Sequence, residues 1–308
     1  MTSSRSTWRA WVLAARLRTL PLSLAGIVAG NALAWRQSEF QWPLFFWAVL
    51  TASLFQILSN FANDYGDGIK GTDNKDRLGP PRALQMGLLR PGQLRRGIWI
   101  VGVLSLFSSG ILIAIAFPAD QYFQVLLFLI LAVLAVVAAI KYTVGNHAYG
   151  YKGLGDVFVF LFFGGVSVLG SYYLQVQQLS YQALLFTICF GGLSVGVLNL
   201  NNMRDIENDK ASGKNTLVVQ WGLANALIYQ CILIGLAALS FTVVLIYSGN
   251  SNIRWLGLIF PVLMLYRLPD FRQTPSPEQL DRGLKPLAIT AFFVALGYWI
   301  LMICLYGA

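Results

Sequence analysis

The sequence predicts an all-α membrane protein that crosses the bilayer about nine times. Of its 308 residues, 56% are hydrophobic and only 11% are charged, whereas a soluble domain carries about 25% charged residues. Apolar runs recur along the whole chain, most of them near the roughly 20 residues that a helix needs to cross a bilayer. We therefore expect one polytopic membrane domain over residues 1–308.

The elements follow from these runs in order. Residues 1–18 carry four arginines among tryptophan and aliphatic side chains, which predicts an amphipathic segment that approaches the bilayer. The first run, 19–35, ends in the Ala-x-Ala pattern of a signal peptide, but the many later spans favour a retained helix. The eight later runs cover residues 42–58, 97–117, 122–140, 157–174, 183–200, 223–248, 255–268 and 287–305. The eighth run of the chain, 255–268, is the shortest and is flanked by arginines.

The basic residues indicate the orientation. If every run crosses the membrane, 20 of the 22 lysines and arginines fall on one side, and only Arg36 and Arg254 fall on the other. The positive-inside rule places the crowded side in the cytoplasm. We expect a multi-pass plasma (inner) membrane protein with a cytoplasmic N-terminus and an external C-terminus. The net charge of +9 is then a topology signal, so nucleic acid is not an expected partner.

Cysteine and histidine offer little chemistry. The three cysteines lie inside apolar runs without Cys-x-x-Cys spacing, so neither a disulfide framework nor a zinc site is indicated. The single histidine, His147, excludes a histidine-rich metal site and is interpreted as a loop residue. The sequence gives no indication of an oligomeric state.

The second predicted span continues into a polar segment, 60–77, that holds four of the 13 acidic residues. On a helix, Asn60 and Asp64 lie four residues apart, as do Asn63 and Asp67, so these side chains share one face. Clustered carboxylates repel one another unless a cation lies between them, and Mg²⁺ bridging carboxylates and substrate phosphates resolves such repulsion. A solvated acidic loop without an ion is the alternative for this segment alone.

A matching motif ends the sixth predicted span. Asn201-x-x-x-Asp205 repeats the spacing of Asn60-x-x-x-Asp64, and Asp209 extends it by one turn. Two such motifs on one side of the membrane, four spans apart, predict two related four-helix units that deliver carboxylates to one cavity. Ionisable residues at such a cavity are functional by default. We expect catalytic roles for Asp64, Asp67, Asp205 and Asp209, and Mg²⁺ binding by these four with Asn63.

Basic side chains near the motifs suit phosphate oxygens, and an apolar tail fits between the spans. Together these features describe a lipid diphosphate whose head lies at the cytoplasmic mouth and whose chain lies in the membrane. The candidate substrate-binding residues are Asn60, Asn63, Tyr65, Lys70, Arg77, Tyr142, Asn201, Asn202, Arg204 and Lys214.

At these residues the chain resembles the UbiA superfamily of membrane prenyltransferases, whose hallmark is two Asp-rich motifs. More narrowly, SNFANDYGDGIKGTD, KYTVGNHAYGYKGLGD, LNNMRDIENDKASGKNTLVV and the RTLPLS entry resemble the branch that prenylates 1,4-dihydroxy-2-naphthoate in menaquinone or phylloquinone synthesis. The resemblance implies nine helices around a central cavity. It also implies Mg²⁺-dependent transfer of a polyprenyl or phytyl group from its diphosphate to an aromatic acid, with loss of CO₂, giving a demethylated quinone.

The chain departs from the family pattern in the first motif and in one loop. The opening of the family's Asn-Asp-x-x-Asp-x-x-x-Asp motif matches at 63–67, but Gly71 stands where the last aspartate is expected and Asp73 lies two residues further on. The loop lysine that some relatives carry four residues after a tyrosine is Asn146 here. Aromatic faces stabilise the allylic cation that forms when the diphosphate leaves. Candidates are Tyr65, Tyr142, Tyr149 and Tyr151, with interfacial anchoring as the alternative for each.

Two alternatives stay open at this point. The first alternative is a prenyltransferase of the same superfamily that uses another aromatic acid, such as 4-hydroxybenzoate, as its acceptor. In a different class, the protein is a membrane transporter with a cytoplasmic acidic ion site. Transporters usually bind their cargo near the midplane on broken helices. Here the acidic clusters lie at one face, which favours an enzyme.

Overall fold

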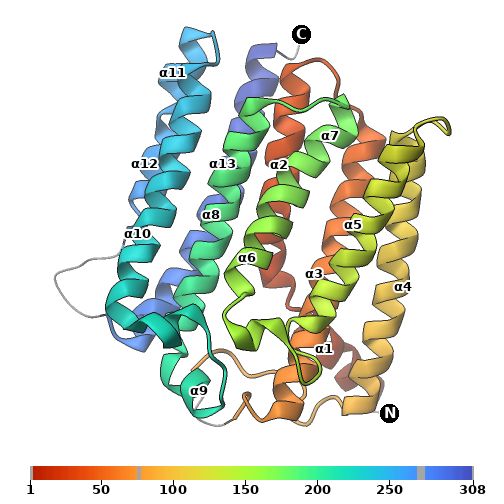
Figure 1. The fold of residues 1–308 in the computed structure, drawn as a ribbon, viewed down its shortest axis with the longest axis vertical. Helices are drawn as coiled ribbons and strands as arrows, with labels where there is room; N and C mark the ends of the chain where they lie inside the picture. The colour runs from red at the N-terminus through yellow and green to blue at the C-terminus, as the bar shows by residue number, and fades with distance from the viewer. Residues whose placement is uncertain (1–2, 75–77, 269–274, 307–308) are drawn as a thin grey trace.

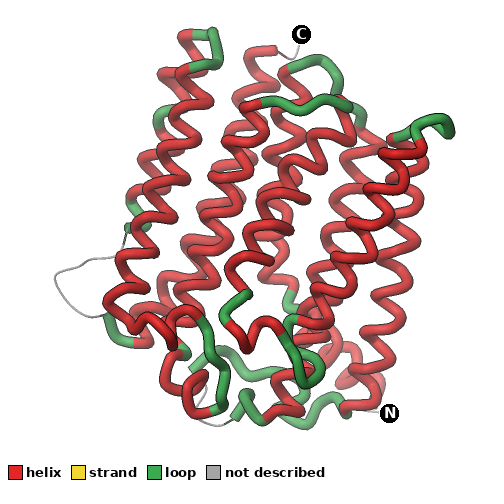
Figure 2. The backbone as a smooth tube through the Cα atoms, in the orientation of Figure 1, coloured by secondary structure: helices red, strands yellow, loops and turns green. Residues whose placement is uncertain are grey.

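The structure is a computed structural model that describes residues 3–74, 78–268 and 275–306, and every regular element in these ranges is a helix (Figures 1 and 2). The elements are α1 (Ser3–Ala15), η1 (Leu17–Thr19), α2 (Leu20–Arg36), α3 (Trp42–Lys70), α4 (Pro91–Ala116), α5 (Tyr122–Lys141), η2 (Tyr149–Lys152), α6 (Gly155–Val159), η3 (Phe160–Gly170), α7 (Ser171–Val176), α8 (Tyr181–Arg204), α9 (Ile206–Ala211), α10 (Leu217–Ile246), α11 (Ser251–Gly257), α12 (Ile259–Leu265) and α13 (Pro277–Tyr306).

Eight segments in the described ranges are long and apolar enough to cross a membrane. The predicted eighth run instead forms two short helices, α11 and α12, which run beside α10 (Figure 1). The predicted fifth run is also composite, because the 11-residue π-helix η3 lies between α6 and α7. The nine predicted runs therefore correspond to eight segments of membrane-spanning length and one shorter apolar pair, α11 and α12. A π-helix of this length is rare and commonly marks a functional region.

The spans form two units of four, as predicted. The first unit is α2 to α5, and the second runs from the α6–η3–α7 segment through α8 and α10 to the α11–α12 pair. The last helix, α13, packs against both α2 and α8 and so joins the units. The two acidic motifs lie at the ends of α3 and α8, the second helix of each unit.

The bundle has two chemically different ends. The motif end holds α1, α9, η2 and the ends of α3 and α8, whereas α13 finishes at the opposite end (Figure 1). At that opposite end lie Arg36, in the last turn of α2, and Arg254, on α11. The connectivity thus keeps the predicted charge asymmetry. By the positive-inside rule we expect the motif end to face the cytoplasm.

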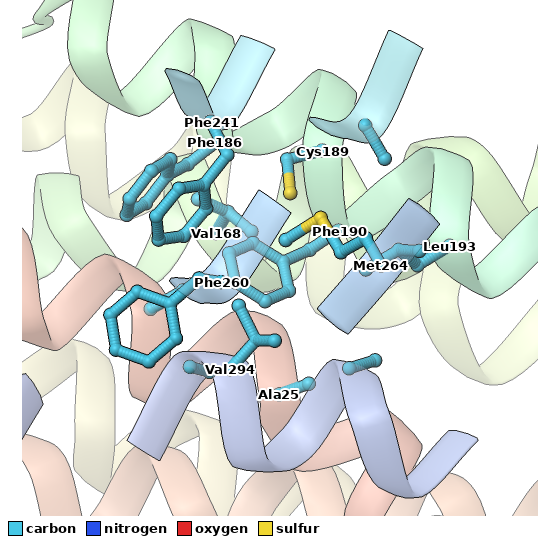
Figure 3. Close-up of a cluster of buried hydrophobic side chains, with 14 of the residues drawn as sticks. Ala25, Val168, Phe186, Cys189, Phe190, Leu193, Phe241, Phe260, Met264 and Val294 are labelled. Carbon is cyan, nitrogen blue, oxygen red and sulfur yellow. The ribbon is translucent and has the colours of Figure 1, made fainter. Parts of the chain in front are cut away.

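The interior around α8 is filled with apolar side chains. The large cluster of buried apolar side chains draws on α2, η3, α8, α10, α12 and α13. In α8, 72% of the most apolar window is buried, against 17% in α5, so α8 is the central helix and α5 faces outward. Figure 3 shows part of this cluster, with Ala25, Val168, Phe186, Cys189, Phe190, Leu193, Phe241, Phe260, Met264 and Val294 labelled.

The π-helix approaches α8 closely through glycine. A Cβ on Gly164 would lie 2.8 Å from the carbonyl oxygen of Thr187 and 2.9 Å from the Cα of Gly191, and backbone atoms cannot move aside. A Cβ on the neighbouring Gly165 would meet no atom within 4 Å. Small residues at such contacts let membrane helices pack by van der Waals forces.

These two glycines give a matched test of that packing. We expect Gly164→Ala to destabilise the fold by about 1–3 kcal/mol, the usual cost of overpacking. Gly165→Ala should be neutral or stabilising by up to about 1 kcal/mol, since alanine favours helix over glycine. The measurement is the thermal unfolding midpoint of each purified variant in detergent. Equal midpoints for the two variants would contradict the close approach.

Orientation is tested by cysteine labelling. Lys210 on α9 and Asn252 on α11 are both exposed and lie at opposite ends of the bundle. In a chain whose three native cysteines are replaced by alanine, Asn252→Cys should react with an impermeant thiol reagent added to intact cells. Lys210→Cys should react only after permeabilisation. The reverse pattern would show that the motif end faces outward.

Candidate active site

The first motif lies on the last turns of α3, where the helix projects beyond the apolar core. Gly71 ends the helix with φ 74°, a left-handed conformation that glycine adopts without strain. The chain then turns back, and the backbone N–H groups of Thr72 and Asp73 donate to the carbonyl of Asp67 at 3.0 and 3.4 Å. Glycine at position 71 thus lets the chain turn so that Asp73 lies beside Asp67, where both contact Arg82.

Arg82 bridges these two aspartates. Its Nη1 lies 2.6 Å from Asp67 Oδ2 and 2.8 Å from Asp73 Oδ2, and it donates to the carbonyl of Asn63 at 2.8 Å. Burial alone would lower the pKa of Arg82, but the two carboxylates outweigh it and raise the pKa. Sequence reasoning missed Arg82 as a site residue. The available signal was an arginine directly after Pro80-Pro81, in the loop that follows the motif.

The same loop covers Asp64. This side chain is fully buried, and its two oxygens accept hydrogen bonds from the backbone N–H groups of Ala83 and Leu84, at 3.2 and 3.3 Å. Each carboxylate oxygen keeps a further lone pair. Asp64 therefore orders the loop that carries Arg82, in addition to the ligand role predicted for it.

Tyr151 links the first motif to the loop between α5 and α6. Its hydroxyl donates to Asp67 Oδ1 at 2.8 Å, so the 2.6 Å contact with Thr72 Oγ1 has the threonine as donor. The ammonium of Lys70 lies 3.9 Å from the centre of the Tyr151 ring, a cation–π contact. Burial and Asp67 raise the pKa of Tyr151, which keeps the phenol protonated. The sequence marked Tyr151 only as a possible cation-stabilising ring.

The second motif is held by ion pairs. Asp205 caps the end of α8, and Arg204 makes two hydrogen bonds to it, from Nε at 2.8 Å and Nη2 at 2.6 Å. Arg204 also contacts Asp281 on α13 at 2.7 Å and Asn201 Oδ1 at 2.9 Å. The guanidinium proposed for substrate phosphates is thus bound to protein carboxylates.

Asp209 lies one turn beyond Asp205, on α9. Its backbone N–H donates to the Asp205 carbonyl at 2.8 Å, which preserves the predicted four-residue stacking although α8 ends at Arg204 and α9 begins at Ile206. Lys214 Nζ lies 3.4 Å from Asp209 Oδ1. Burial raises the pKa of Asp209 to about 6, with Lys214 opposing the shift.

Several buried oxygens of the second motif lack a hydrogen-bond partner in the described structure. They are Asp209 Oδ2, Asn202 Oδ1 and Asn208 Oδ1. Buried acceptors without partners are costly, and carboxylate and amide oxygens are the ligands that Mg²⁺ prefers. As the described side chains stand, no three acidic, histidine or cysteine groups are grouped closely enough to hold one ion. The carboxylate and amide oxygens of this site suit a hard cation such as Mg²⁺. In the structure the carboxylates pair with arginine and lysine side chains of the protein itself.

The two motifs meet at the motif end. Asn208 Nδ2 donates to the carbonyl of Thr72 at 3.0 Å, and the Asn215 N–H donates to the carbonyl of Tyr151 at 3.1 Å. Lys214 lies 5.9 Å from the Tyr151 ring centre. Segments from both units and from the intervening loop therefore form one polar surface.

The remaining predicted substrate-binding residues have varied surroundings. Asn60 donates to the Ala15 carbonyl at 2.8 Å and to Thr19 Oγ1 at 3.0 Å, so its amide fastens the N-terminal segment to α3. Tyr65 packs in the apolar cluster beneath α1 and does not line the cavity. Arg77 lies outside the described residues.

An apolar cavity of about 320 Å³ begins beside the motifs and extends into the first unit. On α3 its wall runs from Asn63 to Ala48, and 15 residues of helix span roughly 22 Å. Tyr142 lies at the mouth, where burial and Asp67 raise its pKa and keep it neutral. The other lining residues are Ser23, Ile27, Thr51, Ala52, Phe55, Gln56, Ser59, Ser109, Leu112, Ile113, Phe128, Leu131, Ala132, Ala135, Ala138, Ala139, Tyr149, Phe158, Val159, Phe162, Phe163, Val166, Ser167, Gly170, Ser171, Leu174 and Leu198.

A membrane bundle that brings two aspartate-rich helix ends to the mouth of a long apolar cavity has the architecture of a membrane prenyltransferase. Residues 23–297 match the UbiA prenyltransferase family, and the chain belongs to that family. It is 41% identical over 300 residues to 1,4-dihydroxy-2-naphthoate octaprenyltransferase of Escherichia coli (strain K12), covering 96% of each chain. It is 42% identical over 256 residues to the enzyme of that name from Haemophilus influenzae, covering 82% of each.

Solved structures share the fold at low sequence identity. A UbiA homologue from Archaeoglobus fulgidus, described as bound to DMAPP and Mg²⁺, superposes with a TM-score of 0.65 at 13% identity, over 96% of this chain and 99% of that one. A structure described for digeranylgeranylglyceryl phosphate synthase gives a TM-score of 0.64 at 18% identity, over 99% and 100%. The predicted UbiA-like helical architecture is confirmed.

Proposed function

We propose that this membrane protein transfers a polyprenyl group from its diphosphate to 1,4-dihydroxy-2-naphthoate, as the name of its Escherichia coli and Haemophilus influenzae relatives describes. The observation that carries the proposal is that a cluster of charged side chains lies beside an apolar cavity. Buried carboxylates and basic side chains from both units lie next to Asn63 and Tyr142, and these two residues line a cavity whose wall is otherwise mostly apolar. A prenyl diphosphate has the same division between a charged head and an apolar chain.

The diphosphate head is assigned to the motif end. Arg82 pairs with Asp67, Lys214 pairs with Asp209, and Lys70 lies over the Tyr151 ring, and all three suit phosphate oxygens. A bound diphosphate would compete with Asp67 and Asp209 for the Arg82 and Lys214 side chains.

Magnesium fits the donor set of this surface. The predicted ligands Asn63, Asp64, Asp67, Asp205 and Asp209 supply hard oxygen donors, and the partnerless oxygen of Asp209 is the observation that supports their use. When bound, Mg²⁺ would offset the charge of the diphosphate and make it a better leaving group.

The reaction balances without a redox partner. The bond between the first prenyl carbon and its oxygen breaks, and diphosphate leaves with the electron pair. The ring carbon that bears the carboxylate attacks the allylic cation. The bond to the carboxylate then breaks, CO₂ leaves, and the electron pair restores the aromatic ring. The product is the hydroquinone form, and reaching the quinone takes a further two-electron oxidation.

The chain's own aromatic residues suit the cationic intermediate. Tyr149 and Phe158 stack with ring centres 4.0 Å apart on the cavity wall, and Tyr142 meets Tyr149 edge-on at 5.4 Å. Aromatic faces attract a cation without forming a bond to it. Because these rings line the cavity, they also exclude water that would otherwise trap the cation.

The acceptor is tested with purified protein. With Mg²⁺ and a polyprenyl diphosphate, we expect 1,4-dihydroxy-2-naphthoate to be prenylated with release of CO₂, followed by mass spectrometry and carboxyl-labelled substrate. Removal of Mg²⁺ by a chelator should abolish turnover. Prenylation of 4-hydroxybenzoate in preference to the naphthoate would replace the acceptor and keep the enzyme class. Absence of any prenylated product would favour the transporter alternative.

The shared use of both motifs is tested by kinetics. Asp67→Asn and Asp209→Asn should each lower turnover by at least ~10²-fold, the size typical of losing one preorganised electrostatic group. Groups that act as a unit are non-additive, so the double variant should be little worse than the poorer single one. Turnover is measured across a Mg²⁺ titration.

The matched control is Asp120→Asn, an exposed carboxylate in the turn between α4 and α5 at the opposite end of the bundle, which should keep full activity. Asparagine preserves shape, so the thermal midpoints of all variants should stay close to that of the parent protein. Losses that multiply in the double variant would show that the motifs serve separate steps.

A further inference from the structure

One wall of the cavity is polar although the cavity as a whole is apolar. Gln56, Ser59 and Asn63 all line it from α3, at spacings of three and four residues that place them on one helical face. The seven residues from Gln56 to Asn63 cover roughly 10 Å of helix axis. This polar wall, defined by these three side chains, begins at the mouth and runs about two turns inward. Ligand sites in proteins are commonly apolar with a few convergent polar groups.

Each member of the polar wall keeps hydrogen-bonding capacity within the described structure. Ser53, on the same helix, donates to the Val49 carbonyl at 2.7 Å, as serines in apolar helices usually do, whereas the Ser59 hydroxyl makes no such bond in the described ranges. Gln56 donates from Nε2 to Asn60 at 3.2 Å and leaves its Oε1 acceptor. Asn63 accepts from Thr143 Oγ1 at 3.3 Å and leaves its amide donor.

A second part of the lining, contributed by η2, α6 and η3, is rich in aromatic side chains. Tyr149, Phe158 and Phe162 form a stacked series there, with ring centres 4.0 and 6.4 Å apart. The lining from α4, α5 and α7 is mostly aliphatic and aromatic, and its serines, Ser109 and Ser171, donate their hydroxyls to backbone carbonyls of the preceding turn. A prenyl chain and its allylic cation match these surfaces, but they cannot use an amide oxygen, a hydroxyl and an amide donor in a row.

We propose that Gln56, Ser59 and Asn63 form the acceptor-binding wall, which recognises the hydroxyl and carboxylate groups of a bicyclic aromatic acid. The assignment rests on the proposed function. Gln56 Oε1 accepts from one phenolic hydroxyl, Ser59 bonds to the ring's oxygen substituents, and the Asn63 amide donates to the carboxylate. This places the carboxylate at the mouth, where Arg82 contacts the Asn63 carbonyl at 2.8 Å.

The orientation agrees with the chemistry of transfer. The ring carbon that bears the carboxylate is the one that is alkylated, so it must lie near the first carbon of the prenyl diphosphate. That carbon is tied to the diphosphate at the motif end. An acceptor bound with its carboxylate toward Asn63 presents the correct carbon to the donor, with the rest of the ring lying inward along α3.

The test compares two serines on one helix. Ser59→Ala should raise the KM for the naphthoate about tenfold, since losing one hydrogen bond to a charged or phenolic group costs about that factor. Its KM for the prenyl diphosphate should stay within twofold of the parent value. Ser53→Ala, which removes a hydroxyl that does not line the cavity, should change neither constant. Gln56→Met provides the second cavity variant, with the same expectation for the acceptor KM.

Substrate analogues separate contact from structure. The inhibition constants of 1-hydroxy-2-naphthoate and 4-hydroxy-2-naphthoate are measured for each variant. Each residue is expected to contact one hydroxyl of the acceptor. For the analogue that lacks this hydroxyl, Ser59→Ala or Gln56→Met should raise the inhibition constant by less than about twofold. A change in general packing would instead weaken all acceptors alike.

The outcomes are distinguishable. If the parent protein prenylates the naphthoate but both variants keep its acceptor KM within twofold, the polar wall binds only water and the assignment is overturned. If the variants raise the KM of the prenyl diphosphate instead, the wall belongs to the donor and the assignment is also overturned. If the parent protein does not use the naphthoate at all, the proposed function itself fails, and that is seen before any variant is made.

Discussion

The hydrogen bond from Tyr151 to Asp67 is the contact on which the site depends. Tyr151 belongs to the loop between the two units, and its backbone also receives the Asn215 N–H from the second motif. Burying several carboxylates at one point is unfavourable unless each has a counter-charge or donor. Arg82 and Lys214 supply the charge, and Tyr151 supplies a donor that fixes where Asp67 points. The two motifs come together because their charges are compensated by shared neighbours.

The two related units have taken different packing roles. Around α8, aromatic and aliphatic side chains fill the interior (Figure 3). In the first unit, alanines and serines of α2, α3, α4 and α5 leave a cavity, and the π-helix η3 forms the wall between the halves. The close approach at Gly164 holds that wall against α8. The packed interior around α8 thus lies against η3, which forms part of the cavity wall.

Much of the site was predictable because the spacing of residues along a helix determines which side chains share a face. Residues four apart on an amphipathic helix end share a face, and this placed Asp64 with Asp67 and Asp205 with Asp209. The same spacing does not say which partner a side chain meets. Asn60 bonds to the N-terminal segment, Tyr65 packs under α1, and Arg204 pairs with Asp281 seventy-seven residues away.

The sequence by itself determined the class of protein, the order of the apolar segments, the acidic motifs and the charge asymmetry between the ends. These are local properties, set by apolar run length and by residue type within a few turns. Only the tertiary structure decided that Arg82 bridges Asp67 and Asp73, that Tyr151 joins the motifs, and that α3 presents a polar wall to the cavity. These contacts join segments brought together by packing, and the free energy that selects them comes from burial and charge compensation across the whole bundle.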